Sequence, residues 1–215
     1  MLLDHFIFVH MMKTGGTTFN RTIKEIFENG NCVFTDKIFR RYRRDEIVCL
    51  NKWSEQHIPM ELDLNKHRFI LGHFTVNKYK HLHWPMLTFL RDPVKRVVSY
   101  YSVWLHNKEG PKPKWPIEKF AKKTANYMHF ATNGDLDQFA FIGLCERYVE
   151  SFQIFERMFK IKVPDKKGWY NQTPGRKIYT PTQDEIDFVE SVNKKDRKLY
   201  NKALVKFEEQ VKKWL

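Results

Sequence analysis

The stretch that most constrains the fold lies near the start of the chain, at residues 6–18, and reads FIFVHMMKTGGTT. It opens as a short apolar run rich in Phe, Ile and Val, which is typical of a buried β-strand. A glycine-containing turn follows, and apolar residues at helical spacing begin at about Phe19. A strand, a turn and a helix N-terminus in this order predict an anion site, because exposed N–H groups and the positive helix end point at one place.

The composition of the turn suits phosphate. A lysine supplies positive charge, threonines supply hydroxyl donors, and two glycines let the backbone approach a phosphate without a Cβ in the way. A Walker loop places its lysine after the glycines, whereas here the lysine precedes them, and no convincing apolar strand ends in an aspartate for magnesium. An ordinary NTPase is therefore disfavoured. The residues assigned to phosphate binding are Lys13, Thr14, Gly15, Gly16, Thr17 and Thr18.

Length, charge and cysteine content narrow the alternatives. The 215 residues suffice for one α/β domain over 1–215 and are too few for two comfortable ones. The net charge of +13 indicates an anionic partner such as a nucleotide, an acidic polysaccharide, a nucleic acid or a membrane surface, unless it only aids solubility. Three cysteines without a C-x-x-C pair favour neither a disulfide framework nor a zinc site. With no signal peptide or membrane span visible, we expect a cytoplasmic protein, or else a trimmed catalytic domain.

The rest of the chain alternates between short apolar runs and helical patterns. The first helix is expected to stop near residues 29–30, and strands are predicted at 32–34, 68–73 and 86–90. Helices are predicted from residue 93 onward, at 117–123, over most of 135–159 with an interruption near Gly143, and from a capping box at Thr182 to the end with a break near Asn193. This order predicts a three-layer α/β fold with a mostly parallel sheet.

A second candidate phosphate site follows the strand predicted at 86–90. Arg91 stands at its end, Asp92 is placed to cap the next helix, and Pro93 suits that helix's first turn. Ser99 lies seven residues after Asp92, so two helical turns return it to the same side. Arg91 and Ser99 are thus expected to converge on one phosphate, the alternative being a structural Arg-Asp pair beside a routine helix.

Three stretches of the chain together resemble one enzyme family. Residues 10–19, HMMKTGGTTF, resemble the 5′-phosphosulfate loop of the sulfotransferases that use 3′-phosphoadenylyl sulfate (PAPS). They look closest to the carbohydrate branch that contains the heparan sulfate 2-O- and 6-O-sulfotransferases. Residues 87–101, LTFLRDPVKRVVSYY, are similar to that family's 3′-phosphate segment, and residues 141–148, FIGLCERY, to a weaker signature. Met12 departs from the pattern, which usually has proline before the lysine.

The resemblance implies a P-loop NTPase-like sulfotransferase fold and transfer of a sulfuryl group from PAPS to a hydroxyl, with PAP as product and no metal. Lys13 then stabilises the leaving phosphate, and Arg91 and Ser99 bind the 3′-phosphate. The loop at 171–177 is implied to close over the nucleotide through Thr173 and Arg176, or is a solvated basic loop. The membrane anchor and the disulfide cysteines of the animal Golgi enzymes are not evident in this sequence. We therefore expect a cytoplasmic protein, and the alternative is the trimmed catalytic domain of a Golgi-lumenal enzyme.

His73 is the candidate base for the acceptor hydroxyl. It follows a short apolar strand and a glycine, and ligands bind at the carboxyl ends of strands in open α/β sheets. It also resembles the Gly-His position that supplies the catalytic histidine in the 2-O-sulfotransferases. A neutral imidazole near pH 7 accepts a proton. The alternative is a structural or exposed histidine; His10 is a rival with an expected supporting role, and His81 and His83 are expected at the surface.

The acceptor is predicted to be hydroxylated and acidic, such as a glycan, rather than a nucleic acid. Two other functions stay open: a nucleotide-dependent phosphotransferase, and a non-catalytic module that binds polyanions. Tryptophans 84, 104 and 115 either stack on sugar rings or, more commonly, pack in the core. Residues 39–50 are either a solvated helix face or an acceptor-binding patch. Residues 108–116 are predicted to be a loop, either a flap or a linker, and are a further candidate for contacts with the acceptor. The basic residues that we consider for an acceptor groove are Arg40, Arg43, Arg44, Lys78 and Lys80.

Overall fold

The computed structural model describes residues 4–27, 33–36, 62–64, 67–106, 115–164 and 178–215. Within them, five parallel strands form one sheet in the order β2-β3-β1-β4-β5. The side chains of β1, β3 and β4 are buried throughout, as expected for a parallel sheet covered on both faces. The strands are β1 (Phe6–Val9), β2 (Val33–Asp36), β3 (Phe69–Gly72), β4 (Met86–Leu90) and β5 (Phe139–Leu144).

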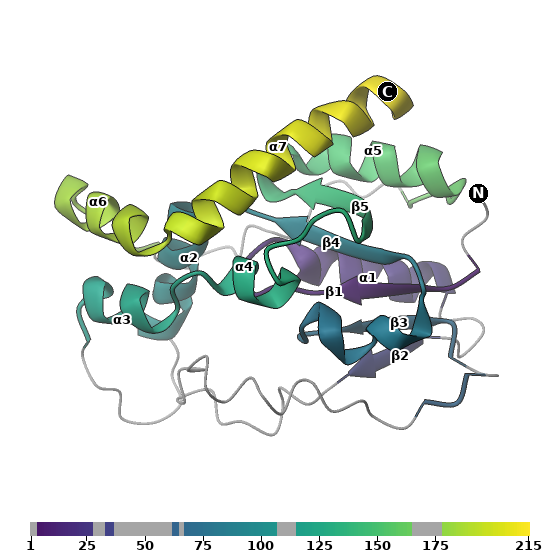
Figure 1. The fold of residues 1–215 in the computed structure, drawn as a ribbon, viewed down its shortest axis with the longest axis horizontal. Helices are drawn as coiled ribbons and strands as arrows, with labels where there is room; N and C mark the ends of the chain where they lie inside the picture. The colour runs from purple at the N-terminus through teal and green to yellow at the C-terminus, as the bar shows by residue number, and fades with distance from the viewer. Residues whose placement is uncertain (1–3, 28–32, 37–61, 65–66, 107–114, 165–177) are drawn as a thin grey trace.

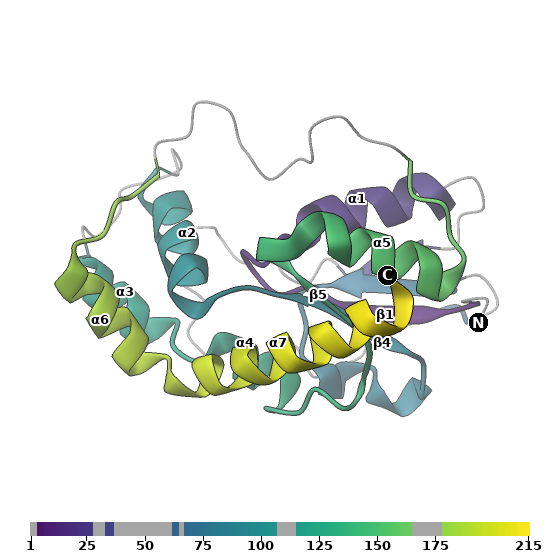
Figure 2. The same cartoon turned by 90° about the horizontal axis from the view of Figure 1, so that it is seen from above.

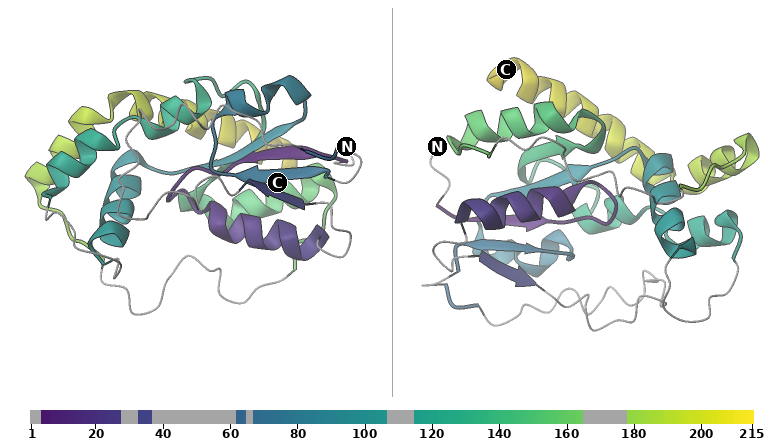
Figure 3. Two further views of the ribbon diagram at one scale, coloured as in Figure 1. Left: turned by 90° about the horizontal axis from the view of Figure 1, so that it is seen from below. Right: turned by 180° about the vertical axis from the view of Figure 1, so that it is seen from behind.

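Helices cover both faces of the sheet (Figures 2 and 3). Helices α1 (Gly16–Phe27) and α5 (Tyr148–Phe159) lie on one face, and α4 (Tyr127–Thr132) and α7 (Lys194–Trp214) lie on the other. On the first face, the ring of Phe19 packs 4.5 Å from the ring of Phe8 and 5.0 Å from that of Phe155, measured between centroids. The predicted three-layer α/β class is confirmed.

Three further helices gather beyond the carboxyl ends of the strands (Figure 1). They are α2 (Pro93–Leu105), α3 (Ile117–Lys123) and α6 (Gln183–Val192), and they enclose a second apolar cluster built around Tyr101 and Trp104. Trp104 is buried there and Trp115 packs against it, with ring centroids 6.0 Å apart. The packing interpretation of these two tryptophans is therefore confirmed. Short 3₁₀ turns lie at Val76–Lys78, Lys80–Leu82 and Cys145–Arg147.

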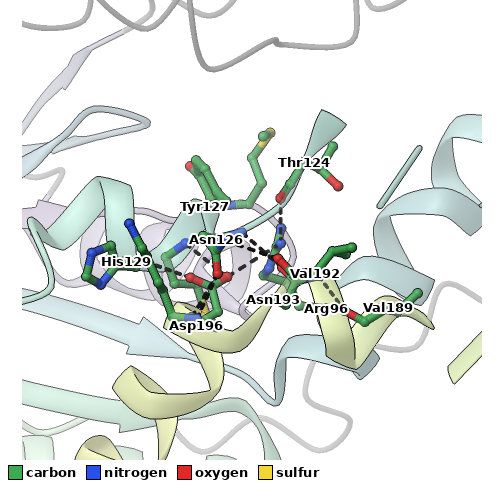
Figure 4. Close-up of polar contacts among 12 residues, drawn as sticks. Arg96, Thr124, Asn126, Tyr127, His129, Val189, Val192, Asn193 and Asp196 are labelled. Atoms are coloured by element: carbon green, nitrogen blue, oxygen red, sulfur yellow. Dashed lines mark hydrogen bonds and ion pairs between the residues drawn. The ribbon is translucent and has the colours of Figure 1, made fainter. Parts of the chain in front are cut away.

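A buried polar network joins this helical cluster to the rest of the molecule (Figure 4). Arg96 of α2 and Asp196 of α7 form an ion pair at 3.7 Å, and neither side chain is exposed. Asp196 also accepts the backbone N–H groups of Met128 at 3.3 Å and His129 at 2.7 Å, at the start of α4. Arg96 donates from Nη2 to the carbonyl of Thr124 at 3.0 Å. Three helices far apart in sequence thus meet at one buried carboxylate.

Most predicted boundaries agree with the structure. The cap at Asp92 is confirmed, because its Oδ1 accepts the N–H of Lys95 at 2.9 Å. The capping box at Thr182 and the break at Asn193 are also confirmed. Helix α1 begins at Gly16, however, which is earlier than Phe19, so two threonines of the loop belong to its first turn.

The prediction of mainly helical structure over 135–159 is wrong for its first half. Residues 139–144 form the edge strand β5, which pairs with β4. Gly143, which was expected to interrupt a helix, instead lets the ring of Phe89 approach: a Cβ at this position would lie 2.5 Å from that ring. One strand also ends in an aspartate, contrary to expectation, namely β2 at Asp36. It is separated from β1 by β3, so it does not adjoin the phosphate loop.

In the described part of the chain, no helix is both long and apolar enough to span a bilayer.

Candidate functional site

The predicted site residues meet where three neighbouring parallel strands, β1, β3 and β4, end. Val9 of β1 lies beside Gly72 of β3 in the register, so His10 and His73 emerge next to each other. Arg91 follows β4 on the other side of β1. This is the edge of an open α/β sheet at which ligands bind. A cavity of about 260 Å³ opens here, and it is lined by His10, Met12, Lys13, Gly15, Thr17, His73, Arg91, Ser99, Tyr100, Val103 and Cys145.

The loop between β1 and α1 has a backbone shaped for this turn. Gly15 has φ of +93°, and Lys13 has φ of +65°, a left-handed conformation that costs a non-glycine residue about 1–2 kcal/mol. Side chains from elsewhere hold the loop carbonyls: Arg91 Nη1 donates to the carbonyl of Lys13 at 3.2 Å, and Tyr148 Oη donates to that of Gly15 at 2.9 Å. The first N–H groups of α1 have no intrahelical acceptor, so the loop presents donors to an anion.

Three loop residues do not act as their types suggested. The hydroxyl of Thr14, expected as a donor to phosphate, donates instead to the carbonyl of Met11 at 2.9 Å and is buried. Thr18 is also buried and does not line the cavity, because it lies on the covered side of α1. Gly16 likewise faces inward: a Cβ there would lie 2.3 Å from Cδ2 of His10. Gly16 is thus required by the neighbouring ring, and Thr17 is the threonine that lines the cavity.

Met12 uses a group that proline lacks. Its backbone N–H donates to Tyr127 Oη at 3.4 Å, and proline at this position removes that donor. The aromatic ring of Tyr127 in turn lies under the guanidinium of Arg96, 5.3 Å from its centroid. The departure from the sulfotransferase pattern therefore links the loop to the buried network between α2 and α7.

The two histidines form a stacked pair with defined hydrogen bonds. The ring centroids of His10 and His73 are 4.1 Å apart. His73 Nδ1 lies 2.6 Å from the carbonyl oxygen of His10, which accepts only, so Nδ1 carries a proton. In the neutral ring of His73 the lone pair is therefore on Nε2. Burial lowers the pKa of His10 well below its usual value, and the charges of His73 and Lys13 lower it further.

The buried His10 makes stability depend on pH. As pH falls below about 6.5, residue 10 binds a proton in the unfolded chain, while the folded protein keeps it neutral. The folded state is therefore expected to lose about 1 kcal/mol at this residue between pH 7.5 and 5.5. Urea unfolding at both pH values should show a larger loss for the wild type than for His10→Gln. Equal losses would mean that His10 is not held neutral.

Arg91 and Ser99 face the same cavity as Lys13. Arg91 Nε is buried and makes no hydrogen bond within the described residues, so the guanidinium retains a donor after binding the loop. Ser99 lies on α2, half-buried, two turns from the cap. Arg91 and Ser99 therefore line one cavity, as the spacing predicted. The role of both residues in binding a 3′-phosphate stays a prediction.

Several candidates are not among the residues that line the cavity. Thr173, Arg176, Arg40, Arg43 and Arg44 are outside the described residues, as are residues 39–50 and 108–114. The two lysines proposed for an acceptor groove differ. Lys78 is buried, with Nζ 5.6 Å from the Tyr79 ring centroid, so it does not line a surface groove, whereas Lys80 is exposed. Trp84 packs 4.9 Å from the ring of His5, and His81 and His83 are exposed as predicted.

Sequence reasoning missed three wall residues, Tyr100, Val103 and Cys145, and also Tyr148, which binds the loop from outside the cavity lining. Burial raises the pKa of Tyr100 to about 12, so its phenol stays protonated. Burial also raises the pKa of the Cys145 thiol, against the nearby charges of Arg91 and Lys13; a protonated thiol is a poor nucleophile. Cys145 follows β5, and recognising that strand would have placed it at the site. Among the described residues, no group of three His, Cys, Asp or Glu side chains is arranged to hold a metal ion.

Comparisons with known proteins find a distant structural likeness. No protein-family model matches the sequence, and no curated protein matches it. Among solved structures, the mouse sulfotransferase SULT7A1 complexed with PAP matches over 96% of this chain and 85% of that chain, with 13% sequence identity and a TM-score of 0.46. A likeness this distant leaves the activity of this chain to be inferred from its own site.

Proposed function

We propose that this protein is a sulfotransferase that moves a sulfuryl group from PAPS to an acceptor hydroxyl on a carbohydrate. The observation that supports this most is the meeting of Lys13, Arg91 and His73 in one cavity beside a helix N-terminus. Cations and exposed N–H groups suit a phosphosulfate. A neutral histidine in the same cavity suits the removal of a proton from an alcohol.

The residues present fit the donor nucleotide. The phosphosulfate would lie against the N–H groups at the start of α1, with Lys13 and Thr17 beside it. Arg91 and Ser99 would hold the 3′-phosphate, since the guanidinium retains a buried donor at Nε and the serine lies on the adjacent helix. PAPS supplies an activated sulfuryl group, because its sulfur is bonded to a phosphate oxygen that leaves with the electron pair.

His73 and Lys13 have complementary tasks in the transfer. His73 takes the acceptor's hydroxyl proton on Nε2 while Nδ1–H stays bonded to the carbonyl of His10. The deprotonating oxygen forms its bond to sulfur as the bond from sulfur to the phosphate oxygen breaks. Lys13 stabilises the negative charge that develops on that oxygen. Holding both partners in one cavity supplies the alignment that in-line transfer needs.

Two other functions account for less of the site. For a magnesium-dependent phosphotransferase, a carboxylate beside the loop is needed. The neighbours of β1 are β3, which ends at Gly72 and is followed by His73, and β4, which ends at Leu90 and is followed by Arg91. Asp92 caps α2, and Asp36 lies one strand further away, at the end of β2. Among the described residues, the cavity lining contains no carboxylate. A polyanion-binding module would account for the net charge of +13. It would leave the orientation of His73 at the cavity unexplained.

The donor assignment predicts a preference for a 3′-phosphate. Adenosine 3′,5′-bisphosphate at about 100 times its Kd should raise the melting temperature by roughly 5–10 °C, because such binding adds about 2.7 kcal/mol. AMP at the same concentration should raise it much less. Ser99→Ala should narrow the difference between the two nucleotides, whereas Lys95→Ala, at an exposed position on the same helix, should preserve it. Equal shifts from both nucleotides would contradict the 3′-phosphate site.

Transfer itself is tested with labelled PAPS and a panel of acceptors. Label should move to glycans in preference to peptides and small alcohols. Transfer only to small alcohols would support the assignment as a sulfotransferase but would contradict the assignment of a carbohydrate acceptor. No transfer to any of them, together with equal nucleotide shifts, would contradict the proposed function as a whole.

A further inference from the structure

A buried histidine, His10, stacks on His73 and has no task in the proposed reaction. His10 is 6% exposed, and its ring stacks on that of His73. Asn20, in the second turn of α1, contacts the same ring, with Nδ2 3.0 Å from His10 Nδ1. We infer that Asn20 and His10 are positioning residues: Asn20 holds His10 as a neutral ring protonated on Nε2, and this ring reserves proton uptake for His73. The inference rests on the proposed function in taking His73 as the base.

The contact with Asn20 favours one tautomer. The structure places the amide nitrogen Nδ2 against Nδ1 of His10; because this nitrogen only donates, Nδ1 accepts and the neutral ring carries its proton on Nε2. The amide oxygen Oδ1 is buried and has no hydrogen-bond partner within the described residues. Nδ1 is occupied by Asn20, and Nε2 lies beside Gly16 of the phosphate loop, where a Cβ would stand 2.7 Å from it. A ring N–H is favourable beside phosphate and sulfate oxygens, whereas a lone pair there would repel them. The tautomer that Asn20 selects is therefore the one that an anion site needs.

The stacking decides which ring is protonated. Two imidazolium rings with centroids 4.1 Å apart repel each other, so the pair takes up one proton readily and a second with difficulty. His10 is buried and also faces the charge of Lys13, whereas His73 is half-buried at the cavity. The single proton therefore goes to His73, beside a neighbour that stays neutral while the acceptor is deprotonated.

The packing leaves the His10 ring little room to turn. Asn20 holds one edge, and a Cβ on Gly16 would lie only 2.3 Å from Cδ2. The ring of Phe8 stacks nearby with its centroid 5.6 Å away, and the ring of His73 stacks at 4.1 Å. A ring held in this way transmits a change at Asn20 to His73, because it cannot rotate away from either.

The test is a pH titration of both histidines in the full chain, monitored by ¹⁵N NMR of their imidazole rings. In the wild type, His10 should show a proton on Nε2 and a pKa well below the usual value of a histidine, while His73 takes up the first proton of the pair. Asn20→Asp offers a carboxylate to Nδ1–H, which favours a charged His10. His10 should then be protonated at pH 7, and the midpoint of His73 should fall by about one pH unit, a tenfold loss of proton affinity. The acidic limb of the pH–rate profile should move with it.

Two variants control for changes of packing and of charge. Asn20→Leu removes the donor without adding charge, so His10 should lose its single tautomer while the midpoint of His73 stays near that of the wild type. Asn201→Asp places the same new charge on the exposed side of α7 and should change neither ring. Melting temperatures identify any variant that fails to fold.

Three outcomes would overturn the inference. In one, the proton of wild-type His10 is on Nδ1, which would leave its lone pair on Nε2 and make His10 the base. In another, Asn20→Asp lowers the melting temperature but leaves the titration of His73 unchanged, as expected of a purely structural residue. In the third, wild-type His10 titrates near pH 6.5. The NMR readout requires no turnover, so a failure of sulfuryl transfer contradicts the proposed function and not this pair.

Discussion

Replacing His73 with alanine should lower the rate of sulfuryl transfer by about 10²–10⁴-fold, the usual contribution of a general base. The ring nitrogen Nδ1 is committed to the carbonyl of His10 at 2.6 Å, which leaves Nε2 to accept the acceptor's proton. The loss should fall on kcat, because His73 is not required to hold the nucleotide. Steady-state rates at saturating PAPS, with the Kd for PAP measured separately, separate these two effects.

The controls for this experiment use the other histidines. His81→Ala, at an exposed position, should leave both kcat and the Kd for PAP unchanged. In the wild type, the rate should rise with pH as His73 loses its proton, and this rise should be missing from the residual activity of His73→Ala. If His73→Ala retains full activity, another group removes the proton, and the base has to be sought on the acceptor or at His10.

The phosphate loop was predictable because its signal is local. An apolar run, a turn with two glycines and an amphipathic helix are contiguous, and the structure has this order in β1, the loop and α1. The task of each residue was less predictable. The hydroxyl of Thr14 donates to the backbone three residues away, and Gly16 is required by the ring of His10. Both depend on how the turn folds back on itself, which residue type alone does not specify.

The strand β5 was missed because its signal is not local. Residues 139–144 lie next to a strongly helical segment, and a short apolar run fits a buried helix as well as a strand. What decides the structure is pairing with β4, some fifty residues earlier in the chain. The same limit applies to the histidine pair, since His73 was identified from its own strand, whereas its stacking on His10 follows from the register of β1 and β3.

The buried carboxylate of Asp196 could not be identified from its neighbours in the sequence either. It lies in a stretch rich in lysine and arginine near the start of α7, a pattern typical of a solvated helix face. The structure buries it completely against Arg96. Burial raises the pKa of Asp196 even though Arg96 and two backbone N–H groups oppose the change. A charged side chain is kept in such a place only when its partners are in position.

Asp196→Ala is therefore expected to be among the most destabilising single substitutions in the described part of the chain. Removing one partner of a buried ion pair leaves the other charge unpaired, at a cost of about 3–5 kcal/mol in the free energy of unfolding. The N–H groups of Met128 and His129 lose their acceptor as well. Urea unfolding measures the loss. Asp196→Asn should lose less, since its side chain keeps an oxygen for one N–H, and Asp4→Ala, which breaks an exposed pair with Arg68, should lose little.

Substitutions at Asp196 should also weaken nucleotide binding in molecules that remain folded. Arg96 lies three residues before Ser99 on α2 and against the ring of Tyr127, which accepts the N–H of Met12 in the phosphate loop. An Arg96 without its partner carboxylate would reorient toward water. Helix α2, which carries Ser99, and the phosphate loop, which is held through Tyr127, would then no longer be fixed relative to each other. Asp196→Asn at a temperature where it is fully folded should therefore raise the Kd for PAP, while Asp4→Ala should not. If the Kd stays unchanged although the free energy of unfolding falls, the network stabilises the fold without positioning the site.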